Sequence, residues 1–321
     1  MSPAAGLSVP LARRVTWSHR LEFALLKALR LVLGRLPESV ALDFGEALGA
    51  FAGGVLRLRH EVVRENLSRA FPELDASGRK RLALSSWRHL GREGVAFMRS
   101  IHTGSPSQQT AEIISRTEVE GLEGLEQALA EGHGAILVTG HLGSWEMAGA
   151  ALAARGVALD GVALVQANPL FDGLVREARE TLGMRLIERG NAMRQVPRSL
   201  RAGRAVGLVA DQNARTGGVF IDFFGHRAAT FRGPALFAIR TGAPIFVGAC
   251  LRSSKRPQRY RLMIERIAFE PSGDLEADVL RLTQAHSSVL ERWVRTAPDQ
   301  YFWAHKRWKT QPGETPPASS V

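Results

Sequence analysis

From about residue 118 to residue 295, short apolar runs alternate with segments of helical periodicity, and this pattern limits the fold most strongly. The apolar runs predict strands at 135–139, 158–165, 184–187, 206–210, 244–251 and 259–269, with a further extended segment at 218–224. The intervening segments predict helices at 121–131, 144–154, 168–182, 192–202, 233–241 and 276–295. Because strands separated by helices pair in parallel, this order predicts an α/β fold, a mainly parallel sheet flanked by helices.

The first third of the chain lacks this alternation and predicts helices at 20–36, 41–58, 57–72 and 77–99. The helix at 20–36 places Leu21, Leu25, Leu29 and Leu33 near one face, with cations between them. Such a basic amphipathic helix can lie in a bilayer interface, and the same pattern equally suits a helix that covers a core. We therefore expect four regions: a disordered 1–19, a helical membrane-associating 20–105, an α/β domain at 106–310 and a flexible tail at 311–321.

Charge and composition limit the classes of partner that the chain is expected to bind. The 321 residues carry 42 Lys and Arg against 31 Asp and Glu, a net charge of +11, which predicts an anionic surface or partner. Nucleic acid is not expected, because zinc-finger spacing, an RNA-recognition signature and a basic helix-turn-helix are all missing. One cysteine excludes a disulfide framework. Metal-ligand spacings and nucleotide-binding loops are also missing, so we expect no metal and no cofactor.

The sequence shows no uninterrupted apolar stretch of about 18 residues, so no clear membrane span is predicted. Residues 1–20 do not match a secretory signal, because their apolar run is short and is broken by Arg13 and Arg14. We expect a protein that is soluble or that lies on a membrane surface.

The stretch GAILVTGHLGSWEMAGA at 134–150 carries the residues best suited to chemistry. His141 follows a predicted strand, at the sheet edge where ligands gather in open α/β folds. Glu146 falls in the first turn of the next helix. From there its carboxylate can hold one imidazole nitrogen while the other accepts a proton from an alcohol. The alternative is a helix-capping glutamate beside a structural histidine. Ser144 is expected to be a helix N-cap.

Five blocks resemble the bacterial late lipid A acyltransferases, a branch of the lysophospholipid and glycerolipid acyltransferases. The blocks are RENLSRAFPEL at 64–74, TGHLGSWEMAG at 139–149, ANPLFDGLVREARETLGMRLI at 167–187, ADQNARTGGVFIDFFGHRAATFRGPALFAIRTGAPI at 210–245 and DQYFWAHKRWK at 299–309. They span nearly the whole chain. The phosphatidylinositol mannoside acyltransferases of actinobacteria resemble the same blocks, so the reaction type is implied more firmly than the acceptor.

The resemblance implies a glycerolipid acyltransferase-like α/β sandwich and acyl transfer from an acyl carrier protein or acyl-coenzyme A to a hydroxyl of a lipid A precursor. His141 would deprotonate that hydroxyl and Glu146 would orient His141, with direct attack on the thioester and no acyl-enzyme. Cys250 is accordingly expected in the core. The helix start after Gly143 would offer backbone N–H groups to the developing oxyanion.

The resemblance also suggests residues that bind substrate: Asn168, Arg179, Asp211, Gln212, Asp222, Thr230, Arg232, His305 and Arg307. Asp211 is expected either to bind substrate or to hold its loop. Asp222 is also a secondary acid/base candidate, and Phe223 and Phe224 either line a groove or belong to the core. For the basic residues of this set, and for Lys306, surface charge is the alternative.

Related enzymes usually place an arginine a few residues before the Asn-Pro pair, where this chain has Gln166 as the nearest polar residue. One phosphate contact is therefore in question. Arg176, Arg179 or Arg185 would substitute for it, and a solvated helix face is the alternative.

Both an acidic carrier protein and a phosphorylated glycolipid are anionic, which agrees with the net charge of +11. The expected location is the cytoplasmic face of a bacterial inner membrane, as a peripheral or monotopic protein. A mannosylated phosphoinositide or a lysophospholipid is the alternative acceptor. From another class, the alternative is a non-catalytic basic protein that binds lipid.

Overall fold

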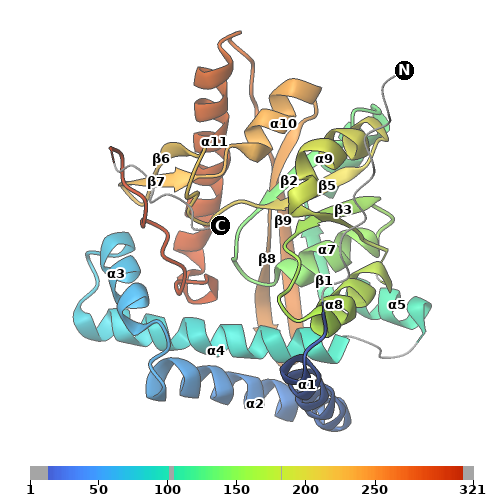
Figure 1. Cartoon of the computed structure of the whole chain (residues 1–321), viewed down its shortest axis with the longest axis vertical. Coiled ribbons are helices and arrows are strands. Elements are labelled where there is room, and N and C mark those ends of the chain that lie inside the picture. The colour runs from blue at the N-terminus through green and yellow to red at the C-terminus, as the bar shows by residue number, and fades with distance from the viewer. Residues whose placement is uncertain (1–13, 101–104, 182, 314–321) are drawn as a thin grey trace.

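The computed structural model describes residues 14–100, 105–181 and 183–313 (Figure 1). The strands are β1 (Thr117–Glu120), β2 (Ala135–Thr139), β3 (Leu159–Ala163), β4 (Arg185–Glu188), β5 (Ala205–Val209), β6 (Val219–Phe223), β7 (His226–Thr230), β8 (Ile245–Lys255) and β9 (Gln258–Arg266). The α-helices are α1 (Trp17–Arg35), α2 (Glu38–Ala50), α3 (His60–Ala70), α4 (Ala76–Ser100), α5 (Pro106–Arg116), α6 (Leu122–Ala130), α7 (Trp145–Ala153), α8 (Pro169–Thr181), α9 (Ala192–Arg201), α10 (Gly233–Thr241) and α11 (Leu275–Thr296). A π-helix, η1 (Phe51–Val55), continues α2, and two 3₁₀ turns are η2 (Arg189–Asn191) and η3 (Pro298–Gln300).

Seven strands form one sheet in the order β1-β9-β8-β2-β5-β3-β4, and β6 and β7 form a separate hairpin. Within the large sheet only β8 and β9 pair antiparallel, so the predicted mainly parallel sheet is confirmed. The strand β2 alternates between two cores. Leu137 packs toward α5, α6 and α7, and Ile136 and Val138 pack toward α9, α10 and α11. The sheet is therefore covered on both faces, as its apolar strands require.

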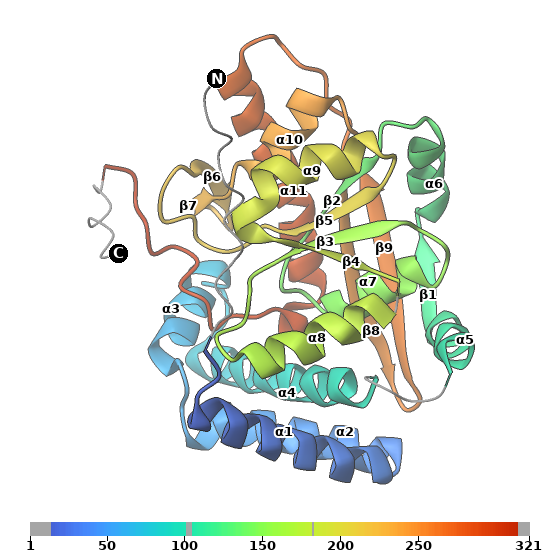
Figure 2. The same cartoon turned by 45° about the vertical axis from the view of Figure 1, so that its right-hand side comes forward.

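The amino-terminal helices form a separate layer below the sheet, where α1, α2 and α4 lie side by side (Figures 1 and 2). Leu33 of α1 and Leu42 of α2 pack against Val95 of α4. Leu21 and Leu25 remain 64% and 63% exposed. The helix α1 therefore covers a small core through Leu33, while Leu21 and Leu25 face outward.

Arg92 joins this helical layer to the sheet. Its side chain is fully buried on α4 and forms ion pairs with Asp43 and Glu46 of α2 at 3.4 and 3.2 Å. The same guanidinium donates to Gln258 Oε1 at 2.6 Å and to the carbonyl of Lys255 at 2.7 Å, both at the β8–β9 turn. One buried cation therefore binds α2, α4 and the sheet together.

Several boundaries differ from the predicted ones. The first helix begins at Trp17, with Thr16 as its N-cap, so the expected disorder at 1–19 is wrong for residues 17–19. Residues 1–13 and 314–321 of the expected loose ends lie outside the described residues. The elements α5, β1 and β7 were not predicted. The α5 segment is mostly polar and buries Gln109 and Ile113, and the strands β1 and β7 are short.

Within the described ranges, no single helix is long and apolar enough to cross a membrane. Two segments, 38–55 and 60–70, together have the length and composition of a span, but the chain bends by 93° at the break between them.

Candidate active site

The register of two adjacent strands brings His141 and Asp211 together. The parallel strands β2 and β5 pair with Thr139 opposite Val209, and each strand is followed two residues later by one of these side chains. Between them, Gly140 allows close approach, because a Cβ at this position would lie 2.9 Å from a carboxylate oxygen of Asp211. The two residues therefore meet at the carboxyl edge of the sheet.

Asp211 contacts His141 at two atoms. Its Oδ2 accepts from the His141 backbone N–H, and its Oδ1 accepts from Nδ1 of the imidazole, both at 2.7 Å. The Asp211 side chain is 3% exposed and that of His141 is 22% exposed. A carboxylate that accepts Nδ1–H fixes the tautomer, so the neutral ring carries its lone pair on Nε2.

The electrostatics of the pair follow from this contact. Burial disfavours the charged imidazole, but the charge of Asp211 and its hydrogen bond outweigh burial and raise the pKa of His141 above 6.5. Burial likewise opposes ionisation of Asp211, and the neighbouring His141 lowers the pKa of that carboxyl overall. The pair therefore stabilises an imidazolium, which is what a general base forms when it accepts a proton.

The outer edge of the imidazole faces an amide and two aromatic rings. The side-chain nitrogen of Gln212 lies 3.4 Å from Nε2. The Trp145 ring packs edge-on with its centroid 5.0 Å from that of His141, and the Phe302 ring lies at 5.9 Å. These side chains come from the loop after β5, from α7 and from the carboxyl-terminal segment.

The predicted contact between His141 and Glu146 is wrong. Glu146 instead accepts two hydrogen bonds from Arg179 of α8, at 3.0 and 2.5 Å, and one from the Trp145 indole at 3.2 Å. The carboxylate that orients the ring is Asp211, for which the sequence suggested substrate binding or loop support. The sequence signal for Asp211 was its place at the end of a predicted strand, but the sequence does not say that this strand lies beside β2.

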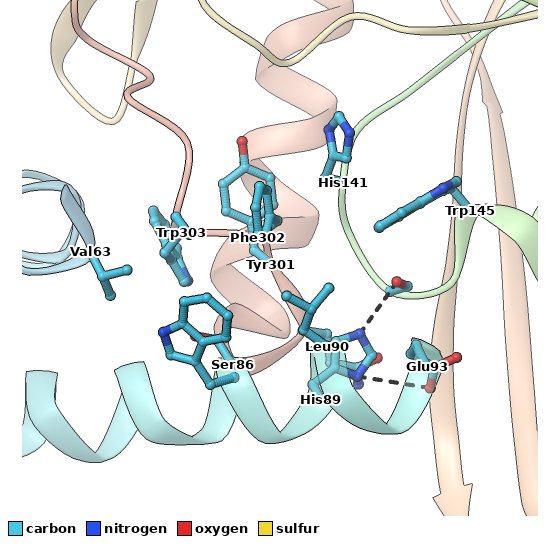
Figure 3. A pocket seen from close by; sticks show the side chains of 14 residues that line it. Val63, Ser86, His89, Leu90, Glu93, His141, Trp145, Tyr301, Phe302 and Trp303 are labelled. Atoms are coloured by element: carbon cyan, nitrogen blue, oxygen red, sulfur yellow. Dashed lines mark hydrogen bonds and ion pairs between the residues drawn. The ribbon is translucent and has the colours of Figure 1, made fainter. Parts of the chain in front are cut away.

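A pocket opens between this edge of the sheet and α4 (Figure 3). His141 and Trp145 lie on one side, Leu90 of α4 lies below them, and Phe302 and Trp303 lie on the side of Val63. The space within its lining is about 370 Å³, including space that is open to solvent. The lining is mostly apolar, so the pocket suits a hydrocarbon chain beside a polar reacting group.

Of the N–H groups at the helix start after Gly143, which were expected to face an oxyanion, those of Ser144 and Met147 are already bonded. The N–H of Gly143 donates to the carbonyl of Gln300 at 2.9 Å, and that of Ser144 donates to the carbonyl of Cys250 at 2.8 Å. Gly143 has φ +64°, and a Cβ there would lie 2.0 Å from that Cys250 oxygen, so only glycine fits. The Ser144 hydroxyl caps α7 by accepting from Met147 N–H, as predicted.

Two of the predicted substrate contacts are buried. Arg307 is 3% exposed and donates to the carbonyl of Ala229 and to the hydroxyl of Thr230, which is 1% exposed. Surface charge and substrate contact are therefore both wrong for Arg307, and substrate contact is wrong for Thr230. Phe223 and Phe224 are core residues.

The remaining predicted residues hold loops and helices in place. Asn168 caps α8 through Leu170 N–H and donates to the His19 carbonyl of α1. His305 accepts from Asn213 N–H at 2.9 Å, just after Gln212.

Asp222 and Arg232, which were also predicted to bind substrate, lie on the β6–β7 hairpin and at the start of α10. Asp222 caps the β6–β7 turn through Gly225 N–H, and Arg232 pairs with Glu276 at 2.7 Å. Among the residues with described side chains, no group of three or more His, Cys, Asp or Glu is arranged to hold a metal ion.

The sequence matches, over residues 13–310, a protein family described as bacterial lipid A biosynthesis acyltransferase. The chain belongs to this family. It is an acyltransferase, and the expected family resemblance is confirmed.

Three relatives indicate the range of the family. The lipid A biosynthesis palmitoleoyltransferase of Escherichia coli K12 is 27% identical over 284 residues, 87% of this chain and 88% of the relative. The lipid A biosynthesis lauroyltransferase of the same organism is 26% identical over 285 residues, 88% of this chain and 89% of the relative. The phosphatidylinositol mannoside acyltransferase of Mycobacterium tuberculosis H37Rv is 31% identical over 225 residues, 67% of this chain and 68% of the relative.

Proposed function

We propose that this acyltransferase moves a fatty acyl group from an acyl carrier protein or acyl-coenzyme A thioester to a hydroxyl of a lipid A precursor. The observation that carries the proposal is His141, which is held by Asp211 at Nδ1 and lines a mostly apolar pocket. That arrangement places a base beside a space for an acyl chain.

In the reaction, Nε2 of neutral His141 takes the proton of the acceptor hydroxyl as its oxygen attacks the thioester carbonyl. The imidazolium that forms is stabilised by Asp211. Collapse of the tetrahedral intermediate breaks the C–S bond, and the imidazolium returns its proton to the departing thiolate. The Gln212 amide, 3.4 Å from Nε2, is positioned to donate to the oxyanion.

The nucleophiles near the site support direct transfer. Cys250 is fully buried, and burial raises the pKa of its thiol well above 9.0, which keeps it protonated. The Ser144 hydroxyl is engaged as a helix cap. A covalent acyl-enzyme is therefore not part of the proposal.

A membrane-surface location is supported by the outer faces of α1, α2 and η1. Most of the large apolar side chains that are exposed in the described chain lie between residues 15 and 58, among them Trp17, Phe44 and Val55. The exposed cations Arg20 and Lys27 accompany them. Apolar side chains beside cations suit an anionic lipid surface. We propose that the enzyme rests here on the cytoplasmic face of an inner membrane.

The proposed acceptor site includes Glu146 and Arg179. Their ion pair is partly exposed, at 21% and 19% of the side chains, and Arg179 also lines a shallow hollow with Arg176 at the ends of β3 and β4. Arg179 would supply the cation that relatives place before the Asn-Pro pair. A mannosylated phosphoinositide is the alternative acceptor, because a phosphatidylinositol mannoside acyltransferase is 31% identical to this chain.

The test is to incubate purified protein with lauroyl and palmitoyl thioesters, each on carrier protein and on coenzyme A. A lipid A precursor, a phosphatidylinositol mannoside and a lysophospholipid serve as acceptors, and products are read by mass. We expect one added acyl mass on the lipid A precursor, lost in His141→Gln. Transfer to the mannoside alone would support the alternative acceptor. Lipid binding without transfer to any acceptor would favour a non-catalytic lipid-binding protein.

A further inference from the structure

A second polar cluster is buried beneath the turn that follows His141 (Figure 3). It consists of His89 and Glu93 of α4 and Arg252 of β8. His89 is 5% exposed, Glu93 is 9% exposed and the Arg252 side chain is 7% exposed. Three buried ionisable groups carry a high desolvation cost, so their geometry is expected to matter.

The contacts of His89 assign its tautomer. Arg252 can only donate, and its NH1 lies 2.8 Å from Nδ1 of His89, so Nδ1 is the acceptor. The proton is therefore on Nε2, which donates to the carbonyl of Gly143 at 3.3 Å. Burial and the charge of Arg252 lower the pKa of His89 to about 3, and the ring stays neutral. Glu93 lies 3.5 Å from the guanidinium of Arg252.

The hydrogen bond from His89 is one of two that hold a single peptide group. The peptide that joins Gly143 to Ser144 has its oxygen bonded to His89 and its N–H bonded to the Cys250 carbonyl at 2.8 Å. Bonds at both ends fix the rotation of that peptide. It lies two residues after His141 and immediately before Trp145, whose ring packs against the imidazole.

We propose that His89 is a positioning residue, which donates through Nε2 to the Gly143 carbonyl and so sets the orientation of the peptide between His141 and Trp145. The inference rests on the proposed role of His141. His89 itself acts from below the turn and takes no proton in the reaction. Its loss would displace the base relative to the acyl chain. A misplacement of about 1 Å can cost about 100-fold in rate.

The test compares His89→Gln with His89→Asn. Glutamine can place an amide N–H near the position of Nε2, whereas asparagine is one methylene shorter and reaches only the position of Nδ1. We expect H89N to lower kcat by about 10- to 100-fold with the KM for the thioester changed by less than about threefold. We expect H89Q to stay within about threefold of the wild type, and the acid limb of the pH profile to stay unchanged in both.

Hydrogen exchange of the peptide that covers residues 141–147 gives a second readout. The Ser144 amide should exchange faster in H89N than in H89Q, whatever the activity of either variant. Wild-type kcat in H89N, or equal impairment and equal exchange in the two variants, would overturn the proposal.

His141→Gln is assayed in parallel as the control on the proposed function. If it stays active, or if the wild type transfers no acyl group, the proposed function fails. The exchange comparison then still decides whether His89 holds the turn.

Discussion

Asp211 supports His141 at the backbone and at the ring, with one carboxylate oxygen on the peptide N–H and the other on Nδ1, both at 2.7 Å. The start of the turn and the orientation of the imidazole are thus fixed by the same side chain. Substitution of this carboxylate should therefore change both the rate of acyl transfer and the proton affinity of His141.

For Asp211→Asn we expect kcat to fall by about 10²- to 10⁴-fold, because the imidazolium and its tautomer lose their anionic partner. The charge of Asp211 raises the pKa of His141, so its removal lowers that pKa. A base that must be neutral then becomes active at lower pH, and the acid limb of the kcat profile should move to lower pH. An acid limb that moves to higher pH, or stays in place, would contradict the assigned pair.

Glu146→Gln should behave differently. Glu146 pairs with Arg179, and the pKa of His141 is set by burial and by Asp211. We expect a smaller loss of kcat than in Asp211→Asn, a raised KM for the lipid acceptor and an unchanged acid limb. Arg179→Gln is the matched variant and should give the same pattern, because it breaks the same ion pair. A shift of the acid limb in Glu146→Gln would restore this residue as the partner of His141.

Leu21→Ser with Leu25→Ser should weaken binding to anionic vesicles. The two side chains are 64% and 63% exposed on α1, and burial of each leucine in lipid is worth roughly 1.5–3 kcal/mol. We expect at least about tenfold weaker cosedimentation. Leu280→Ser is the control, because Leu280 is 40% exposed on α11, a helix outside the layer of α1, α2 and α4. Equal loss in the control would show that the effect is not local to α1.

His286 should make folding stability depend on pH. Burial, followed by the charge of Arg307, lowers the pKa of His286 to about 3 from 6.5. Below pH 6.5 the unfolded chain binds a proton that the folded protein does not, so stability is lost as the pH falls from 6.5 toward 3. His286→Leu should reduce the slope of unfolding free energy by up to about 1.4 kcal/mol per pH unit in chemical denaturation between pH 6 and pH 4.

Local pattern was enough for most of the fold and for part of the site. Apolar runs and helix signals located β2, β5 and α7, and with them the position of His141 at the sheet edge. The partner of His141 depends on which strand lies beside β2, and spacing along the chain does not contain that information. Glu146 was therefore the nearest carboxylate in sequence, while Asp211 is the nearest in space.

The predictions for Arg307 and Thr230 were wrong for a related reason. A basic run near the end of a chain suggests a solvated surface, but this segment packs against β7 and buries Arg307 against the carbonyl of Ala229 and the hydroxyl of Thr230. Only the tertiary path reveals such burial. Helix α5 and strand β1 were not predicted, because the α5 segment is mostly polar and a lone four-residue strand such as β1 has no distinct period.

The buried guanidinium of Arg92 joins α2 and α4 to the β8–β9 turn, and β8 is the neighbour of β2. If α1 and α2 rest on lipid, this cross-link makes the imidazole and the membrane-facing helices a single rigid unit. The distance of the His141 imidazole from the lipid headgroups is then constant, and the acceptor hydroxyl must extend from the membrane to reach it. Lipids whose hydroxyl projects that far would be acylated, and those whose hydroxyl lies deeper would be left unmodified.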